Sequence, residues 1–172
     1  IVRKTLLGFA SQTLSPDQFE VLLVDDGSTD DTVAMARRLK LPLSILLVDV
    51  DRFKGLNDRY GHALGDRVLI TVARALRHGL RGADLACRYG GDEFVVLLPD
   101  TSALRAAEVA NRIRTLAADE LRQAFGRRRV SLSMGLAQAQ DTDTPADVLA
   151  RADVALYAAK QGGRDQLVSA AG

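Results

Sequence analysis

Short apolar runs alternate with amphipathic segments along this chain. The amphipathic segments repeat their apolar residues at helical spacing, which predicts helices over about 3–12, 32–40, 51–80 with a break near Gly61, 101–125 and 145–160. The apolar runs predict strands over about 19–24, 43–50, 85–89, 94–98, 130–139 and 165–169. Most of these strands are separated by a helix, but the two in the middle follow each other directly as a hairpin. This order predicts an α/β sandwich built on a mixed sheet rather than on a purely parallel one.

The central hairpin is expected to turn at Gly90-Gly91. A glycine pair suits a two-residue hairpin turn, because such turns need positive φ and glycine adopts it without steric cost. Asp92 and Glu93 follow at once, so two carboxylates are expected at the tip of the hairpin.

Two further acids, Asp49 and Asp51, mark the end of the 43–50 strand. Open α/β sheets bind ligands beyond the carboxyl ends of their strands, and the N–H groups that begin the following helix offer a phosphate site. If this strand lies beside the hairpin, Asp49 comes close to Asp92 and Glu93. Crowded carboxylates repel one another, and a hard cation such as Mg²⁺ relieves that repulsion. The residues alone leave two alternatives open, metal-dependent phosphate chemistry or surface acids at strand ends and turns.

Composition restricts the possible partners and cellular compartment of the protein more than it restricts the reaction. The formal net charge of the 172 residues is +1, so bulk charge gives no reason to expect nucleic acid or an anionic membrane as a partner. The apolar runs are too short to span a bilayer, and the first residues lack the long apolar core of a signal peptide. The single cysteine, Cys87, excludes an internal disulfide, fits a reducing compartment such as the cytoplasm and is expected only to pack. The basic run 127–129 is interpreted as a solvated loop rather than a phosphate patch.

Motifs spread along most of the chain resemble those of the GGDEF diguanylate cyclase family. They are Asp49-Val50-Asp51-Arg52-Phe53-Lys54, Asn57-Asp58, Tyr60-Gly61-His62, Gly65-Asp66, Arg88 to Phe94, Ala152-Asp153, Leu156 to Lys160 and Gly163-Arg164. The resemblance covers about residues 41–170. It implies a fold like the adenylyl cyclase catalytic domain and the polymerase palm. It also implies that a homodimer condenses two GTP into cyclic di-GMP and two pyrophosphates.

The resemblance also implies a role for individual residues. Asp49 and Asp92 would hold Mg²⁺ (or Mn²⁺) with the carbonyl of Val50, and Asp92 or Glu93 would help to deprotonate the ribose 3′-hydroxyl. The residues expected to bind GTP are Asn57 and Asp66 at the guanine, Phe53 and Lys54 through backbone N–H groups at the phosphates, Lys160 and Arg164 at the triphosphate, and His62. Each has a plainer alternative: a core anchor for Phe53, helix caps for Asn57 and Asp66, a loop residue for His62, and a favourable helix dipole for Lys160 and Arg164.

A regulatory site is implied by Arg81-Gly82-Ala83-Asp84, which matches the family's Arg-x-x-Asp inhibitory site for the product. Arg112 is a second expected contact there. A catalytically impaired domain that binds cyclic di-GMP through Arg81 and Asp84 is therefore an alternative function.

The first 40 residues depart from the family pattern, and 6–39 resembles family 2 glycosyltransferases instead. This predicts a hybrid, natural or engineered, with a fragment at 1–40 and the cyclase domain at 41–172. The fragment would add an αβα segment whose 19–24 strand joins the sheet as an edge strand. Transfer of a nucleotide sugar is a remote alternative, with Asp49-Val50-Asp51 as its metal-binding motif. A smaller departure is Asp165, where the cyclase family usually has Asn.

Overall fold

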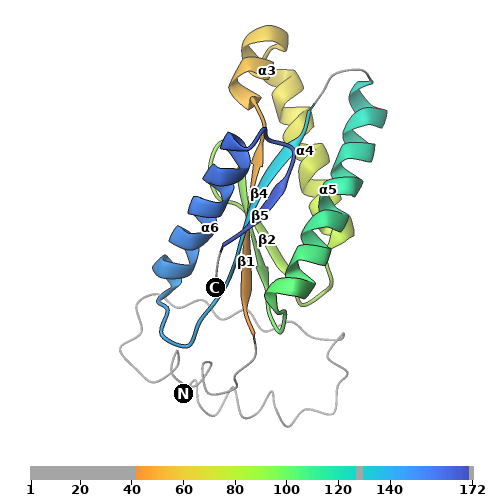
Figure 1. Cartoon of the computed structure of the whole chain (residues 1–172). Coiled ribbons are helices and arrows are strands. Elements are labelled where there is room, and N and C mark those ends of the chain that lie inside the picture. Colours follow the sequence, from red (N-terminus) through yellow and green to blue (C-terminus); the bar gives the residue numbers. More distant parts are fainter. Residues whose placement is uncertain (1–41, 127–129, 171–172) are drawn as a thin grey trace, which may run out of the picture. The chain divides into compact units, whose positions relative to one another are not determined.

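The computed structural model describes residues 42–126 and 130–170. The chain divides into two units, Ile1–Leu41 and Pro42–Gly172, and every element below belongs to the second (Figure 1). The expected helices at 3–12 and 32–40, the 19–24 edge strand and the 127–129 loop lie outside the described residues. The division into a fragment and a cyclase domain stays a prediction.

A five-stranded mixed sheet forms the centre of this unit, in the order β2-β3-β1-β4-β5. Its strands are β1 (Ser44–Val50), β2 (Leu85–Arg88), β3 (Glu93–Leu98), β4 (Leu132–Gln138) and β5 (Leu167–Ser169). Its helices are α3 (Phe53–Tyr60), α4 (His62–Gly79), α5 (Ala103–Phe125) and α6 (Pro145–Gln161). Strand β1 is antiparallel to β3 and β4, while β4 and β5 are parallel. The predicted α/β fold with a mixed sheet is thus confirmed.

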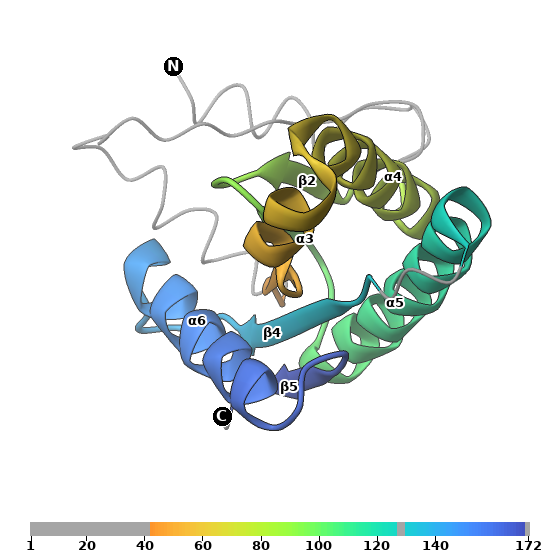
Figure 2. The same cartoon turned by 90° about the horizontal axis from the view of Figure 1, so that it is seen from above.

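Alternation along β1 explains why it lies at the centre of the sheet. Its residues Leu46, Val48 and Val50 face a core that α4 and α5 cover, while Ile45 and Leu47 face a second core under α6. Figures 1 and 2 show these helices on opposite sides of the sheet. Both faces of β1 are buried, so its apolar run is continuous, as expected of a central strand. This central position places Asp49, near the polar end of β1, between β3 and β4.

Close contact between β4 and α6 depends on Gly135. A Cβ atom there would meet the backbone oxygen of Ala152 and the backbone nitrogen of Leu156. Backbone cannot move aside as a flexible side chain can, so we expect Gly135→Ala to lower the free energy of unfolding by about 1–3 kcal/mol or more. Urea unfolding measures this, with Gly55→Ala as the control because a Cβ at that helical position meets nothing within 4 Å. Equal stability of Gly135→Ala and the parent chain would contradict the packing.

Helix α6 begins with a capping box. The Thr144 side chain accepts from the Asp147 N–H, and the Asp147 carboxylate accepts from the Thr144 N–H at 2.8 Å and from its hydroxyl at 2.6 Å. Pro145 occupies the first turn, as predicted. These contacts fix the start of the helix whose last turn carries Lys160.

The capping box makes the stability of α6 depend on pH. Hydrogen bonds from the Thr144 side chain and backbone lower the pKa of Asp147 below its ordinary value of 3.8. A lowered folded-state pKa stabilises the fold above the unfolded value, and this stabilisation is lost as the pH falls through the folded value. We therefore expect Asp147→Asn to lower the melting temperature at pH 7, by a margin that shrinks below about pH 4. Melting curves between pH 7 and pH 3 test this, and a margin independent of pH would count against it.

Two details of the hairpin differ from the prediction. Neither Gly90 nor Gly91 has positive φ, so the predicted positive-φ turn at Gly90-Gly91 is wrong. The turn instead closes with the Tyr89 N–H on the Glu93 carbonyl at 2.8 Å, while the Arg88 guanidinium donates to the Gly91 carbonyl at 2.6 Å. The Glu93 N–H also donates to the Gly90 carbonyl at 3.4 Å, so the tight turn is centred on Gly91-Asp92, one residue later than expected. Cys87 is exposed rather than packed, because β2 is an edge strand and its burial is slight.

Candidate functional site

Three carboxylates approach one another where β1 ends and β3 begins. Asp49 pairs with Glu93 in the antiparallel register, and the Val50 N–H donates to the Asp92 carbonyl at 3.2 Å. Asp49 is buried, while Asp92 and Glu93 are half-buried. The expectation that the 43–50 strand lies beside the hairpin is confirmed.

A lysine far along the chain already occupies this cluster. Lys160, in the last turn of α6, places its Nζ 2.7 Å from Oδ2 of Asp49. Burial raises the pKa of Asp49, the Lys160 ammonium opposes that rise, and the negative charges of Asp92 and Glu93 add to it. The site therefore holds more negative charge than one lysine neutralises.

The oxygen donors of this cluster suit a hard cation. Crowding of Asp49 by Asp92 and Glu93 is the repulsion that a cation would relieve. Within the described part of the chain, no group of three or more His, Cys, Asp or Glu side chains is arranged to hold a metal ion. Mg²⁺ commonly uses one or two carboxylates together with phosphate oxygens, so Asp49 and Asp92 with a nucleotide would be a sufficient set. Lys160 would have to release Asp49 for this to happen.

The helix that follows β1 leaves backbone donors available. Arg52 is the N-cap of α3 and makes no side-chain cap, and the Leu56 N–H bonds the Arg52 carbonyl at 3.0 Å. The N–H groups of Phe53 and Lys54 precede that bond, so the helix itself does not use them. The Phe53 ring packs partly against the core, as the plainer alternative held, and Lys54 is exposed.

The expected guanine contacts meet where α3 and α4 join. The Asn57 amide lies against Gly65, where a Cβ would collide with it, and Asp66 follows on the exposed side of α4. Oδ1 of Asn57 is buried without a hydrogen-bond partner. An unmatched buried acceptor is costly, and a donor on a ligand would satisfy it. The N-caps of α3 and α4 are Arg52 and Gly61, so the helix-cap alternative for Asn57 and Asp66 is wrong.

The remaining expected contacts lie at two helix ends. His62 is the exposed first residue of α4. Arg164 is exposed in the turn after α6, with a φ of 66°. It lines a cavity of about 1020 Å³ at this edge of the domain. The other lining residues are Asp51, Arg52, Ala118, Arg122, Gly126, Val130, Ser131, Gly163 and Asp165.

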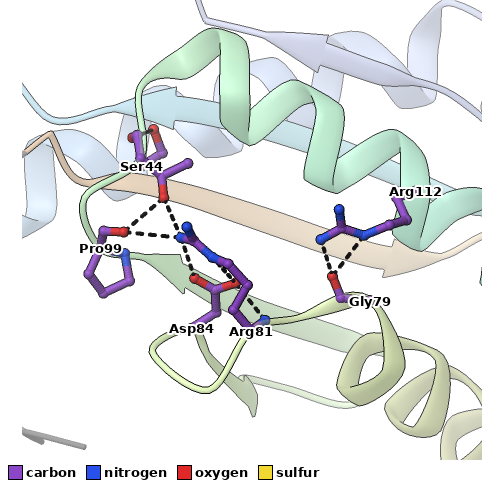
Figure 3. A network of polar contacts seen from close by, with 7 residues as sticks. Ser44, Gly79, Arg81, Asp84, Pro99 and Arg112 are labelled. Carbon is purple, nitrogen blue, oxygen red and sulfur yellow. Dashed lines mark hydrogen bonds and ion pairs between the residues drawn. The ribbon is translucent and has the colours of Figure 1, made fainter. Parts of the chain in front are cut away.

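The residues of the expected inhibitory site gather at the opposite end of β1 (Figure 3). Arg81 donates to Asp84 at 3.0 Å and to the Thr101 hydroxyl at 2.8 Å, and the Thr101 carbonyl accepts from Ser44. The Asp84 side chain is fully buried, whereas 54% of the Arg81 side chain is exposed. Arg112 donates to the Gly79 carbonyl at 2.7 Å, which caps the end of α4. Arg81 and Asp84 thus form a pair, and Arg112 serves the helix end beside it.

Sequence reasoning missed two contacts of the site. It gave Lys160 no partner within the protein. It treated Asp51 only as part of the Asp49-Val50-Asp51 motif and gave it no partner of its own. In the structure the Asp51 carboxylate accepts hydrogen bonds from the hydroxyl groups of Ser133, on β4, and Ser131, just before β4, at 2.6 Å each. These contacts occupy its carboxylate, and they count against an Asp-x-Asp metal motif.

Sequence comparison finds one family model, described as diguanylate cyclase, GGDEF domain, matching residues 26–166. The response regulator PleD of Caulobacter vibrioides is 43% identical over 84% of this chain and 33% of its own length. Diguanylate cyclase A of Treponema denticola is 42% identical over 79% of the chain and 37% of its own length. The chain thus spans about a third of the curated relatives it matches.

Solved structures agree with the sequence match. The GGDEF domain of DgcB from Caulobacter crescentus, in complex with c-di-GMP, superimposes with a TM-score of 0.73 at 28% identity, covering 86% of this chain and 98% of that one. The GGDEF domain of PA1120 from Pseudomonas aeruginosa gives 0.71 at 38% identity, covering 81% and 88%. The family match begins at residue 26 and runs through the expected boundary between residues 40 and 41, and the comparisons give the glycosyltransferase-like fragment and the hybrid no support. No helix in residues 42–126 and 130–170 has the length and apolar character to cross a membrane.

Proposed function

Because the chain belongs to the GGDEF diguanylate cyclase family, we propose that it condenses two GTP into cyclic di-GMP and releases two pyrophosphates. The observation that carries the proposal is the meeting of Asp49, Asp92 and Glu93 at one end of the sheet, with Lys160 on Asp49. An acidic cluster with a lysine beside backbone N–H groups that the helix does not use suits a nucleoside triphosphate with its metal.

Asp49 and Asp92, with the Val50 carbonyl, would hold Mg²⁺ or Mn²⁺, which when bound neutralises the phosphates and supports attack by the ribose hydroxyl. Lys160 would move from Asp49 to the triphosphate, joined by Arg164 and by the N–H groups of Phe53 and Lys54. Lys160 would thus exchange the Asp49 carboxylate for the phosphates of GTP, and the metal ion would replace Lys160 at Asp49.

Asn57 on α3 and Asp66 on α4 would bind the guanine, and His62, the first residue of α4, would be a further contact of GTP. The unpaired Oδ1 of Asn57 supports this placement, since guanine offers N–H donors on its Watson–Crick edge. Guanine carries two adjacent donor groups on that edge, N1–H and the N2 amino group, whereas adenine has an acceptor at N1, so we expect GTP to be used in preference to ATP.

Asp92 or Glu93 would accept the proton of the ribose 3′-hydroxyl. The freed oxygen attacks the α-phosphorus of the other GTP, and pyrophosphate leaves. Two such steps close the ring. Each GTP is bound by one subunit, so the reaction needs a homodimer in which two sites face each other.

GTP is a cytoplasmic nucleotide, and an exposed free thiol at Cys87 suits a reducing compartment, so we place the reaction in the cytoplasm.

Incubation of the purified chain with GTP and Mg²⁺, followed by separation of the nucleotides, tests the proposal. We expect cyclic di-GMP. Unconsumed GTP together with calorimetric binding of cyclic di-GMP would favour the second candidate, a binding domain without catalysis. The exposed guanidinium of Arg81 beside Asp84 is the observation that favours that candidate, because a phosphate could reach it.

Product inhibition at Arg81 and Asp84 gives a separate prediction. Arg81→Ala should raise the concentration of cyclic di-GMP needed for half inhibition by about tenfold or more, because a phosphate contact is lost while the active site at the other end of β1 is untouched. Initial rates at increasing product concentration measure this. The control is Arg105→Ala, which removes an arginine that is 76% exposed and pairs weakly with Glu108. An unchanged inhibition curve for Arg81→Ala would remove the inhibitory-site assignment.

A further inference from the structure

Asp51 is a buried carboxylate for which the proposed chemistry has no use. Its Oδ1 accepts from the Ser133 hydroxyl and its Oδ2 from the Ser131 hydroxyl, both at 2.6 Å. Oδ2 also accepts from the Asp165 N–H at 3.1 Å. The Asp51 N–H in turn donates to the Ser131 carbonyl at 3.0 Å. One side chain therefore joins the end of β1, the start of β4 and the turn after α6.

That turn has a backbone that needs outside support. Arg164 and Asp165 have φ values of 66° and 48°, and Gly163 before them has 116°. Left-handed backbone is unfavourable for residues with a Cβ, so two in succession persist only where the surroundings hold them. Asn tolerates this region better than most residues, and Asp shares some of that tolerance.

The turn is held from two sides. On one side Asp51 binds the Asp165 N–H. On the other side Arg114 of α5 donates to the carbonyl and the carboxylate of Asp165, at 3.3 Å each. The Arg164 N–H bonds the Ala159 carbonyl at 3.0 Å, which ties the turn to the last turn of α6. Arg164 itself is exposed, so its side chain is accessible from solvent.

We propose that Asp51 is a positioning residue, which holds the Gly163–Asp165 turn so that Arg164 meets the triphosphate of GTP. The proposal rests on the proposed function, because it takes the triphosphate as the ligand of Arg164. Asp49 and Asp51 then have different roles at the end of β1. Asp49 lies in the cluster with Asp92 and Glu93, and Asp51 holds the turn that carries Arg164.

A double-mutant cycle tests the coupling. Asp51→Ala should raise KM for Mg-GTP by about tenfold with a smaller change in kcat, and Arg164→Ala should do the same. The double variant should be no worse than Arg164→Ala alone, since Asp51 acts through that arginine. Asp51→Asn should restore most of the loss, because its carbonyl can accept from Ser131 and Asp165 while its amide donates to Ser133.

The control is Ser44→Ala, at the other end of the same strand. Ser44 is fully buried, and its hydroxyl donates to the Thr101 carbonyl at 2.8 Å. Its loss should lower stability without changing KM. If KM rises equally in Ser44→Ala, or if the Asp51 and Arg164 losses simply multiply, the proposal is overturned.

Hydrogen exchange separates this proposal from the proposed function. In the nucleotide-free protein, amides of residues 162–166 should exchange faster in Asp51→Ala than in the parent chain and in Ser44→Ala. Unchanged exchange would overturn the brace even in an active enzyme. Faster exchange in Asp51→Ala, together with a parent chain that makes no cyclic di-GMP, would support the brace and overturn the proposed function. If Asp51→Ala does not fold, the double variant Ser131→Ala, Ser133→Ala frees the Asp51 carboxylate and should shift exchange in the same direction.

Discussion

Replacing Asp49 by Asn should abolish cyclic di-GMP formation while making the protein more stable at neutral pH. Loss of a ligand that carries charge at the reacting phosphates is expected to cost at least about 10²–10³ in kcat, by analogy with removal of one charge-stabilising donor. The stability gain follows from burial, which raises the pKa of Asp49 despite its contact with Lys160.

The sign of the pH dependence follows from that raised pKa. A carboxyl whose folded-state pKa lies above its unfolded value of 3.8 stabilises the fold below that value, and the contribution is lost as the pH rises through the folded pKa. At pH 7 the ionised Asp49 therefore weakens the fold relative to a neutral side chain of the same shape. The melting temperature of Asp49→Asn should exceed that of the parent chain at pH 7, and the two should converge below about pH 4.

The partner of Asp49 supplies the opposite variant. Lys160→Met removes the ammonium that opposes the pKa rise and leaves a buried carboxylate unpaired, so it should lower the melting temperature at pH 7. Mg²⁺ added together with a non-hydrolysable GTP analogue should stabilise the parent chain more than Asp49→Asn. A lower melting temperature for Asp49→Asn at pH 7, or undiminished turnover, would contradict this account of the cluster.

Asp92→Asn is expected to remove turnover without loss of stability. The backbone of Asp92 is anchored by its carbonyl, which accepts from the Val50 N–H, so the turn should keep its shape when the side chain loses its charge. The expected loss in kcat is again at least about 10²–10³, with the melting temperature nearly unchanged. Initial rates and thermal melts on the same preparation measure both quantities.

The matched control for Asp92 lies at the other end of β3. Asp100 is exposed and has a φ of 48°, a conformation that Asn also adopts, so Asp100→Asn should leave turnover intact. Unchanged turnover in Asp92→Asn would remove this residue from the metal and base roles and leave Glu93 as the remaining acid of the turn.

Much of this fold could be predicted because its helices and strands follow from the local pattern of apolar, polar and turn-forming residues. The break at Gly61, the hairpin, the long α5 and the Pro145 start of α6 all follow from periodicity and turn residues. Local patterns also suggested that Asp49 lies near Glu93, but only on the condition that β1 pairs with the hairpin. The structure supplies that condition through the register of β1 and β3.

What the sequence could not show depends on contacts between distant segments. Lys160 reaches Asp49 across 111 positions, and Ser133 reaches Asp51 across 82. Neither contact follows from a motif, because each depends on how α6 and β4 lie against β1. Cys87 was misjudged for a related reason: an alternating pattern cannot tell an edge strand from a covered one. The Gly90-Gly91 turn was predicted one residue too early, because the glycine pair does not show that the Glu93 N–H bonds the Gly90 carbonyl and that the Arg88 guanidinium bonds the Gly91 carbonyl.

The most direct test of the central claim is a count of both products from GTP. The purified chain, incubated with GTP and Mg²⁺, should release two pyrophosphates for each cyclic di-GMP, and a chelator or the Asp49→Asn change should stop both. GTP left intact, or pyrophosphate released without cyclic di-GMP, would contradict the claim that the end of β1 and the acidic hairpin form a site for joining two nucleotides.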